Sequence, residues 1–434
     1  MRTYRELFRT PEFTALFAAS CAQVAATTLT GLALATLVYA RTESPLLSAL
    51  SMFGPSFAAV IGAITLLSVA DRVPPRPAMT LVALAAAVGC LALAAPGVPL
   101  PAMFAVIFAL GLAASIGSGV QYGLLGEIVP PDGYVLGRSV LNMSVGAMQV
   151  AGFALGGVLL TAVSPRTVLL VGAALAAGSL LVVRLGLSAR PARASGRPSL
   201  AITWRVNRDL LSAPARRAVY VAMWVPNGMV VGCEALFVPY APHAAAVLFV
   251  ATALGMLLGD LAAGRFLSPA TRQRYLTPLR YLLAAPFLLF VLPLSLPVAA
   301  VAAAVASVGF MSTLLLQERL LALTGADVRG QALGLHASGM KAMQAAGATL
   351  AGLVAQVLPV GVAMATMAAL SLAVTVALTP GLRLSDPGQN VQRCSSAPEQ
   401  VRSSSRWPSR SGRPPATVRH LPDGGLTSRR LPAS

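Results

Sequence analysis

Three ionisable residues lie inside long apolar runs of the sequence, where a charged side chain is costly. Glu234 lies late in the run 217–240. Lys341, the single lysine of the chain, lies in the run 331–357, with His336 on its N-terminal side. A carboxylate in such a position can carry a proton or bind a substrate, and a lysine needs a counter-charge, water or an anionic ligand. A histidine there can titrate near neutral pH.

Each of these residues also has a purely structural interpretation. Glu234 could extend toward the outer interface, and His336 could be satisfied by hydrogen bonds inside a helix bundle. Counted from the inner ends of their runs, Glu234 is about 26 Å deep and Lys341 about 15 Å deep. The vertical gap of about 10 Å is too long for a direct ion pair, so we expect only partial coupling between them.

A second set of polar side chains in the apolar runs consists of amides. They are candidates for a polar cavity, although most such residues form hydrogen bonds between helices. The set is Gln23, Asn142, Gln149, Asn227 and Gln344. The three histidines, His243, His336 and His420, are too scattered for a metal site, and no phosphate loop or nucleophile–base pair is present. The sequence therefore predicts no enzyme, no catalytic residue, no metal and no cofactor.

The elements that must position these residues are transmembrane helices. Of 434 residues, 56% are hydrophobic and 11% are charged, whereas a soluble domain carries roughly 25% charged residues. Apolar runs of about 20 residues recur, which is the length that crosses about 30 Å of hydrocarbon. The sequence predicts about twelve spans, at 13–40, 46–70, 78–95, 101–126, 134–161, 166–187, 217–240, 244–266, 276–294, 297–318, 331–357 and 360–380.

An arginine-rich interval, 184–217, divides these spans into two sets. Basic loops resist translocation, and with the N-terminus inside only Arg41 and Arg166 fall in outer loops. The formal charge of +18 is therefore interpreted as cytoplasmic loop charge rather than as a nucleic-acid surface. We predict a multi-pass protein of the plasma (inner) membrane with both termini in the cytoplasm. The predicted parts are a first half at 1–187, a basic loop at 188–216, a second half at 217–383 and a disordered cytoplasmic tail at 384–434.

The two halves repeat each other. At one constant offset, the residues Gly62, Arg72, Gly137 and Gly146 recur as Gly255, Arg265, Gly330 and Gly339. Small residues can match by chance in helices rich in alanine and glycine, but the order and spacing together favour a duplication. The predicted fold class is all-α integral membrane, with two pseudo-symmetric six-helix halves. In transporters built in this way the substrate site lies between the halves near the middle of the membrane.

Three local sequences carry a resemblance to a known family. The segment 8–13, followed by 41–50, is similar to the opening of bacterial exporters of drugs and metabolites. The segment 70–76, Ala-Asp-Arg-Val-Pro-Pro-Arg, is a degraded form of a Gly-x-x-x-Asp-Arg-x-Gly-Arg-Arg loop. The segment 152–157, Gly-Phe-Ala-Leu-Gly-Gly, resembles an antiporter motif of the fifth span. Over roughly residues 5–383 the chain thus resembles the major facilitator superfamily, in particular its exporter branch.

The resemblance implies roles for several residues. Asp71, Arg72 and Arg76 would form a gate that holds the inner side shut, with the start of the eleventh span near Gly330 as the partner. If the resemblance is set aside, the alternative interpretation is that Asp71 and Arg72 are ordinary interfacial charges that end the second span and have no gating role.

The fifth-span motif implies close helix packing through Gly152, Gly156 and Gly157, which is also common in any membrane bundle. The first span departs from the exporter branch, which usually has Gly-Asp where this chain has Ala26-Thr27. Any proton coupling must therefore be carried by the second half.

These observations predict a secondary exporter of small amphipathic molecules, which works by alternating access and is driven by proton antiport. Its expected partners are a small-molecule substrate and the lipid bilayer, with no nucleic acid, and we expect a monomer. Uptake of a nutrient such as a sugar stays open as an alternative. A membrane scaffold or sensor that does not transport is the third functional hypothesis.

Overall fold

The structure is a computed structural model that describes residues 4–65, 73–192, 200–265, 269–325 and 328–384. Within these ranges every regular element is a helix and none is a strand. Contacts divide the chain into a unit spanning Met1–Ser385 and a second unit at Asp386–Ser434. The second unit, which contains the predicted tail, lies outside the described residues. The described helices confirm the all-α fold class.

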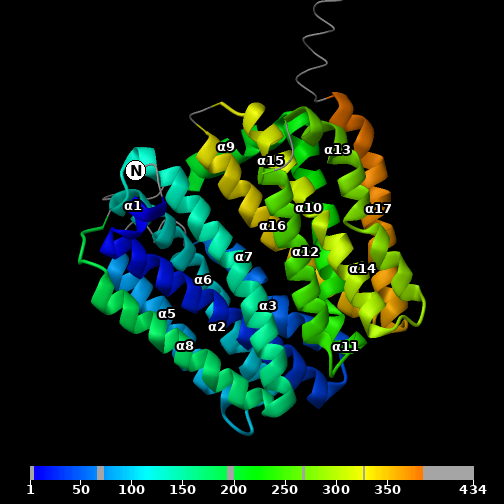
Figure 1. The fold of residues 1–434 in the computed structure, drawn as a ribbon, viewed down its shortest axis with the longest axis horizontal. Coiled ribbons are helices and arrows are strands. Elements are labelled where there is room, and N and C mark those ends of the chain that lie inside the picture. The colour runs from blue at the N-terminus through cyan, green and yellow to red at the C-terminus, as the bar shows by residue number, and fades with distance from the viewer. Residues whose placement is uncertain (1–3, 66–72, 193–199, 266–268, 326–327, 385–434) are drawn as a thin grey trace, which may run out of the picture. The chain divides into compact units, whose positions relative to one another are not determined.

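The first half consists of a short helix followed by six long ones, counted in the described ranges (Figure 1). Several of them begin with a proline at the first helical position, where the missing N–H costs no helical hydrogen bond. Their bounds are α1 Tyr4–Phe8, α2 Pro11–Thr42, α3 Pro45–Thr65, α5 Pro75–Ala94, α6 Leu100–Ile128, α7 Pro131–Ala162 and α8 Pro165–Gly186.

The second half is less regular. The described part of the basic interval contains a helix of its own, α9 Leu200–Ser212, which contacts α10 and α16. The remaining elements are α10 Pro214–Ala235, α11 Phe237–Tyr240, α12 Ala245–Arg265, α13 Pro269–Leu282, the 3₁₀ helix η1 Ala285–Val291, α14 Leu296–Val308, α15 Met311–Ala322, α16 Arg329–Val354 and α17 Val360–Leu384.

Ten helical segments of the described chain are long and apolar enough to cross a membrane. They match ten of the predicted spans, and the other two correspond to α16 and to the α13–η1 pair. Helix α16 has 26 residues and thus sufficient length, but its polar residues, among them Lys341, lower its hydropathy. The ninth predicted span, 276–294, is wrong as a single helix, because α13 ends at Leu282 and a 3₁₀ helix with Pro286 follows.

The tenth predicted span, 297–318, is also divided, and its break lies against the break in the ninth. It stops at Val308 and resumes as α15 after Gly309. A Cβ at Gly309 would lie 2.4 Å from the backbone nitrogen of Leu283, so only glycine permits this approach. The backbone N–H of Ser312 donates to the carbonyl of Gly309 at 3.0 Å, which satisfies part of the interrupted helix locally.

The two halves use the same set of helix contacts. The pairs α2–α8, α2–α7 and α3–α6 of the first half correspond to α10–α17, α10–α16 and α12–α14 of the second. Contacts between the halves also come in a corresponding pair, α3–α16 and α7–α12 (Figure 1). Four helices, α3, α7, α12 and α16, therefore form the boundary between the halves.

Candidate functional site

Contacts between α10 and α16 give a depth scale for the second half. The two helices run in the same direction, and their close approaches pair Trp224 with Gly339, Gly228 with Met343 and Gly232 with Gly347. In each of these pairs the residue number on α16 exceeds that on α10 by about 115. Both helices rise by about 1.5 Å per residue. Residues on one helix can therefore be placed at a level of the other.

On this scale Glu234 and Lys341 lie at different depths. Lys341 lies level with Pro226 of α10, which is eight residues before Glu234. The separation along the bundle is about 12 Å. No ion pair joins them within the described part of the chain. The two charges must therefore act at separate points.

Glu234 is enclosed by protein. Its residue is 8% exposed, and its Oε1 atom has no hydrogen-bond partner among the described residues. The next residue, Ala235, packs with Ala49 of α3 and Ala348 of α16 in one buried cluster. Glu234 thus directly precedes, in α10, a residue at which the two halves meet.

Lys341 has the opposite environment, because its side chain is exposed and has no hydrogen bond or ion pair in the described structure. It precedes Ala345, Ala348 and Gly352 by 4, 7 and 11 residues, spacings that place all four on one face of α16. The latter three are buried. Lys341 therefore lies on the helix face that turns toward the first half, at a level where that face is no longer covered.

Contacts between the halves gather at one end of the bundle. We call the end where α2 ends and α3 begins the arginine-poor end, and the opposite end the arginine-rich end. A Cβ at Gly352 would lie 2.6 Å from the Cα of Leu46, and the Gln356 side chain donates to the hydroxyl of Ser44 at 2.7 Å. These contacts join α16 to α3 at the arginine-poor end.

The α7–α12 boundary is closed at the same end. The rings of Phe153 and Phe249 stack with centroids 4.7 Å apart and an angle of 14° between planes. A Cβ at Gly157 would lie 2.2 Å from the Cβ of Ala246. We call these contacts, together with those of α3 and α16, the seal.

Toward the arginine-rich end the same helix faces are uncovered. On α16, Gly334, Ala337 and Lys341 are exposed, and on α12 Asp260 is exposed 11 residues beyond Phe249. The hydrophobic clusters at this end are built from one half each, whereas the largest cluster, at the seal, contains residues of both. A space between the halves therefore opens toward the arginine-rich end.

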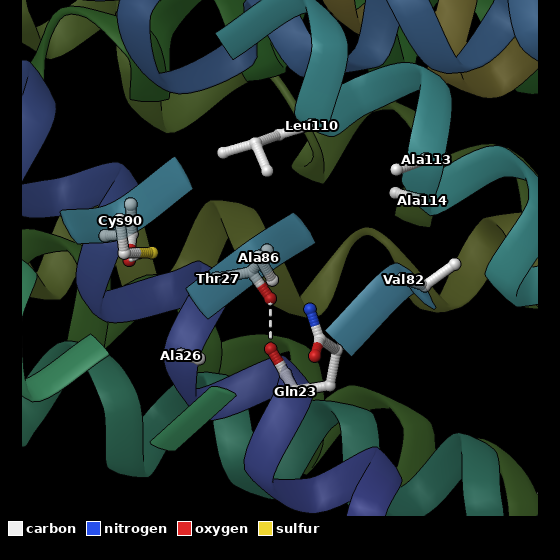
Figure 2. A pocket seen from close by; sticks show the side chains of 10 residues that line it. Gln23, Ala26, Thr27, Val82, Ala86, Cys90, Leu110, Ala113 and Ala114 are labelled. Carbon is white, nitrogen blue, oxygen red and sulfur yellow. Dashed lines mark hydrogen bonds between the residues drawn. The ribbon is translucent and has the colours of Figure 1, made fainter. Parts of the chain in front are cut away.

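A small pocket lies within the first half, between α2, α5 and α6 (Figure 2). It measures about 60 Å³ and contains the polar side chains of Gln23 and Thr27, with Thr27 donating a hydrogen bond to the carbonyl of Gln23. Thr30 and Cys90 lie at the same pocket with their Oγ1 and Sγ atoms 3.4 Å apart. The remaining lining is apolar, so this pocket provides neutral contacts only.

Comparison with known proteins connects this arrangement to one family. The family model for the Major Facilitator Superfamily matches residues 16–317. The chain belongs to the major facilitator superfamily. Comparison with curated protein sequences gives no match. Membership of this family, together with the apolar helices, makes the protein a multi-pass membrane transporter.

Solved structures of other transporters share the fold. A nucleoside transporter, NupG, superposes with a TM-score of 0.67 at 13% identity, covering 85% of this chain and 99% of that one. A peptide transporter, POT, in complex with sulfate gives 0.69 at 15% identity, covering 87% and 95%. A bacterial homolog of the human lysosomal transporter Spinster, inward-facing and unoccupied, gives 0.64 at 15%, covering 87% and 93%. At these identities the likeness shows the fold.

The transporter's third ionisable candidate, His336, is buried in the second half. Its Nε2 atom lies 2.9 Å from the Nε2 atom of Gln317, and its backbone carbonyl accepts a hydrogen bond of 3.1 Å from the indole N–H of Trp224. If the Gln317 amide donates, Nε2 accepts and the proton is on Nδ1. Nδ1 has no partner in the described structure. Gln317, which sequence reasoning missed, is detectable as an amide inside an apolar span.

The amide candidates have different surroundings. Gln344 donates to Asn227 at 3.5 Å, a long contact between α16 and α10. Asn142 accepts a hydrogen bond of 3.0 Å from the hydroxyl of Tyr122, and the guanidinium of Arg138 lies 5.3 Å from that ring. Gln149 is half-buried on α7. The structure thus does not bring the five amides together in one site.

The proposed gate residues are only partly visible. Asp71 and Arg72 lie outside the described residues. Arg76 donates to the backbone carbonyl of Arg184, which joins the start of α5 to the end of α8 at the arginine-rich end. A Cβ at Gly330 would meet nothing within 4 Å. At Gly330 the start of α16 thus has no close neighbour among the described residues on the side where a Cβ would point.

The three packing glycines lie at close approaches. A Cβ at Gly152 would lie 2.9 Å from the side chain of Thr28, and one at Gly156 would lie 3.0 Å from Leu29, both on α2. Gly157 instead faces α12 across the seal. The motif therefore spans two interfaces, one within the first half and one between the halves.

Proposed function

We propose that this transporter exports small amphipathic molecules from the cytoplasm, in exchange for protons, by alternating access. The arginine-rich end is then cytoplasmic, since basic loops stay on that side, and both termini lie there. The membrane is the plasma (inner) membrane. The chain works as a monomer, and its partners are the lipid bilayer and the substrate, with no nucleic acid. The proton motive force drives transport, and no cofactor takes part.

The observation that carries the proposal is the enclosed position of Glu234, which directly precedes Ala235 of the buried cluster formed by α3, α10 and α16. Its carboxyl group is enclosed, and one oxygen lacks a partner in the described structure. Separation of α3 from α16 would open the contact of Ala49, Ala235 and Ala348 and admit water next to it. A proton can then bind from outside as substrate leaves, and it can be released inward once the seal has formed again.

The inner gate completes this cycle. When the halves separate at the seal, they must close at the arginine-rich end, where Asp71, Arg72 and Arg76 would meet the start of α16 near Gly330. A carboxylate favours the positive end of a helix, which gives Asp71 a reason to hold that side shut.

The test uses inside-out membrane vesicles with an acidic interior, monitored by a pH-sensitive dye. An amphipathic substrate should enter these vesicles and dissipate the gradient, and Glu234→Gln should remove the proton movement. Some relatives in structure are transporters of nucleosides and peptides. Accumulation of a nutrient in right-side-out vesicles would favour uptake, and the absence of any substrate-dependent flux would favour a scaffold or sensor.

A further inference from the structure

Two exposed side chains lie next to the seal on facing helices, and they differ in chemistry. Phe57 of α3 is 37% exposed, although it is a large apolar residue. Lys341 of α16 is exposed and has no partner in the described structure. Neither side chain takes part in the seal itself.

The register of α3 and α16 places these residues opposite each other. The helices run in opposite directions, with Leu46 against Gly352 and Ala49 in one cluster with Ala348. A step of 11 residues returns to the same face of a helix. Such a step from Leu46 leads forward along α3 to Phe57, and from Gly352 it leads back along α16 to Lys341. Both are then about 16 Å from the outermost contact, at one level of the bundle.

This level is the closed end of the space between the halves. Phe53, one turn before Phe57, packs against the buried alanine cluster of the seal. On the other wall Ala345 is buried, whereas Lys341 is exposed. A molecule that enters from the arginine-rich end therefore meets an aromatic ring on one wall and an ammonium on the other.

No acidic side chain of the described residues forms an ion pair with Lys341. Glu234 lies about 12 Å away along the bundle, and Asp260 is near the end of α12, 11 residues past the stacked Phe249. An unpaired ammonium between low-dielectric walls attracts anions more strongly than one in bulk water.

We propose that this place binds an amphipathic anion, with its carboxylate on Lys341 and its apolar part against Phe57. The inference rests on the transport function proposed above and narrows its substrate class from amphipathic molecules to amphipathic organic acids. Fixed apolar contacts with one charged group are the usual construction of a small-molecule site.

The test is equilibrium binding to the purified full-length chain in detergent, with three probes of one shape: naphthaleneacetate, its neutral amide and naphthylethylamine. We expect saturable binding of the anion, weaker binding of the amide and still weaker binding of the amine. Lys341→Met should lower the affinity for the anion about tenfold while leaving the amide within about twofold, because only the anion has a charge to lose.

Matched variants separate the two walls. Lys341→Arg should keep most of the anion affinity, and Phe57→Leu should weaken anion and amide alike. The controls are Arg217→Gln, an exposed cation at the start of α10, and Phe108→Leu, an exposed ring on α6, and both should bind as the wild type does. Wild-type anion affinity in Lys341→Met, no saturable anion binding to the wild-type chain, or preference for the amine would overturn the inference.

Binding in detergent requires neither direction nor proton coupling, so the outcomes remain distinguishable. Proton-linked flux without Lys341-dependent anion binding leaves the export proposal standing and removes the substrate class. Lys341-dependent binding without proton-linked flux supports the anion site and removes the export proposal.

Discussion

The two halves share their helix contacts but not their chemistry. The second half encloses Glu234 and His336 and exposes Lys341, all within predicted spans. The first half contains a pocket whose polar lining, Gln23, Thr27, Thr30 and Cys90, is neutral (Figure 2). A duplicated fold can thus keep its packing in both copies, while a buried carboxyl group and a buried histidine occur at these positions in only one of them.

Packing also differs where the first and fifth helix of each half meet. In the second half α10 and α16 approach backbone to backbone, since a Cβ at Gly347 would lie 1.8 Å from the carbonyl oxygen of Gly228. In the first half the corresponding α2–α7 contact is between Gly152 and the side chain of Thr28. A side chain can turn away, whereas a helix backbone cannot.

The largest expected effect follows from this difference. Gly347→Ala should lower the free energy of unfolding by about 3 kcal/mol and Gly152→Ala by about 1 kcal/mol, because overpacking against rigid backbone costs more. Thermal unfolding in detergent measures both. Gly146→Ala, with nothing within 4 Å of the added methyl group, is the control. Equal losses for Gly347 and Gly152 would show that the two interfaces are equally tight.

The next effect concerns the coupling between the charges of the second half. Lys341→Met should reduce transport at least about tenfold. If Lys341 and Glu234 act in one cycle, Lys341→Met combined with Glu234→Gln should lose less than the two single losses added. Initial rates in proteoliposomes supply the measurement. Strictly additive losses would assign the residues to independent steps.

A carboxylate added to the first half should make the halves more alike. Thr27 lies at the pocket, so Thr27→Asp places a carboxyl group where the resembling exporters have one. We expect a pH dependence of transport to return in a Glu234→Gln background, at several-fold lower rate. Thr27→Asn is the neutral control. A flat pH profile for Thr27→Asp would mean that the first half cannot carry the proton.

The smallest expected effect tests the support of His336. Trp224→Phe removes the indole N–H that donates to the His336 carbonyl at 3.1 Å. The loss should be about 1 kcal/mol of stability, the usual net contribution of one hydrogen bond. Thermal unfolding at unchanged pH is sufficient to detect it. A loss several times larger would indicate that the ring packing of Trp224 dominates.

The sequence predicts the helical fold well because the length of an apolar run is a local property of the chain. It fails at the ninth and tenth spans, where the breaks depend on the tertiary approach of Gly309 to Leu283. It predicts from residue counts that Glu234 and Lys341 lie about 10 Å apart in depth, and the register of α10 and α16, with the same rise per residue, gives about 12 Å. It misses Phe57, because the importance of that ring depends on which helix faces it.

The dependence of proton movement on Glu234 tests most directly whether the second half couples protons to transport. The measurement is substrate-induced proton flux in proteoliposomes, compared between the wild type, Glu234→Gln and the first-half variant Gln23→Leu. We expect proton flux in the wild type and in Gln23→Leu, and substrate movement without proton flux in Glu234→Gln. Undiminished proton flux in Glu234→Gln, or its loss in Gln23→Leu alone, would contradict this expectation.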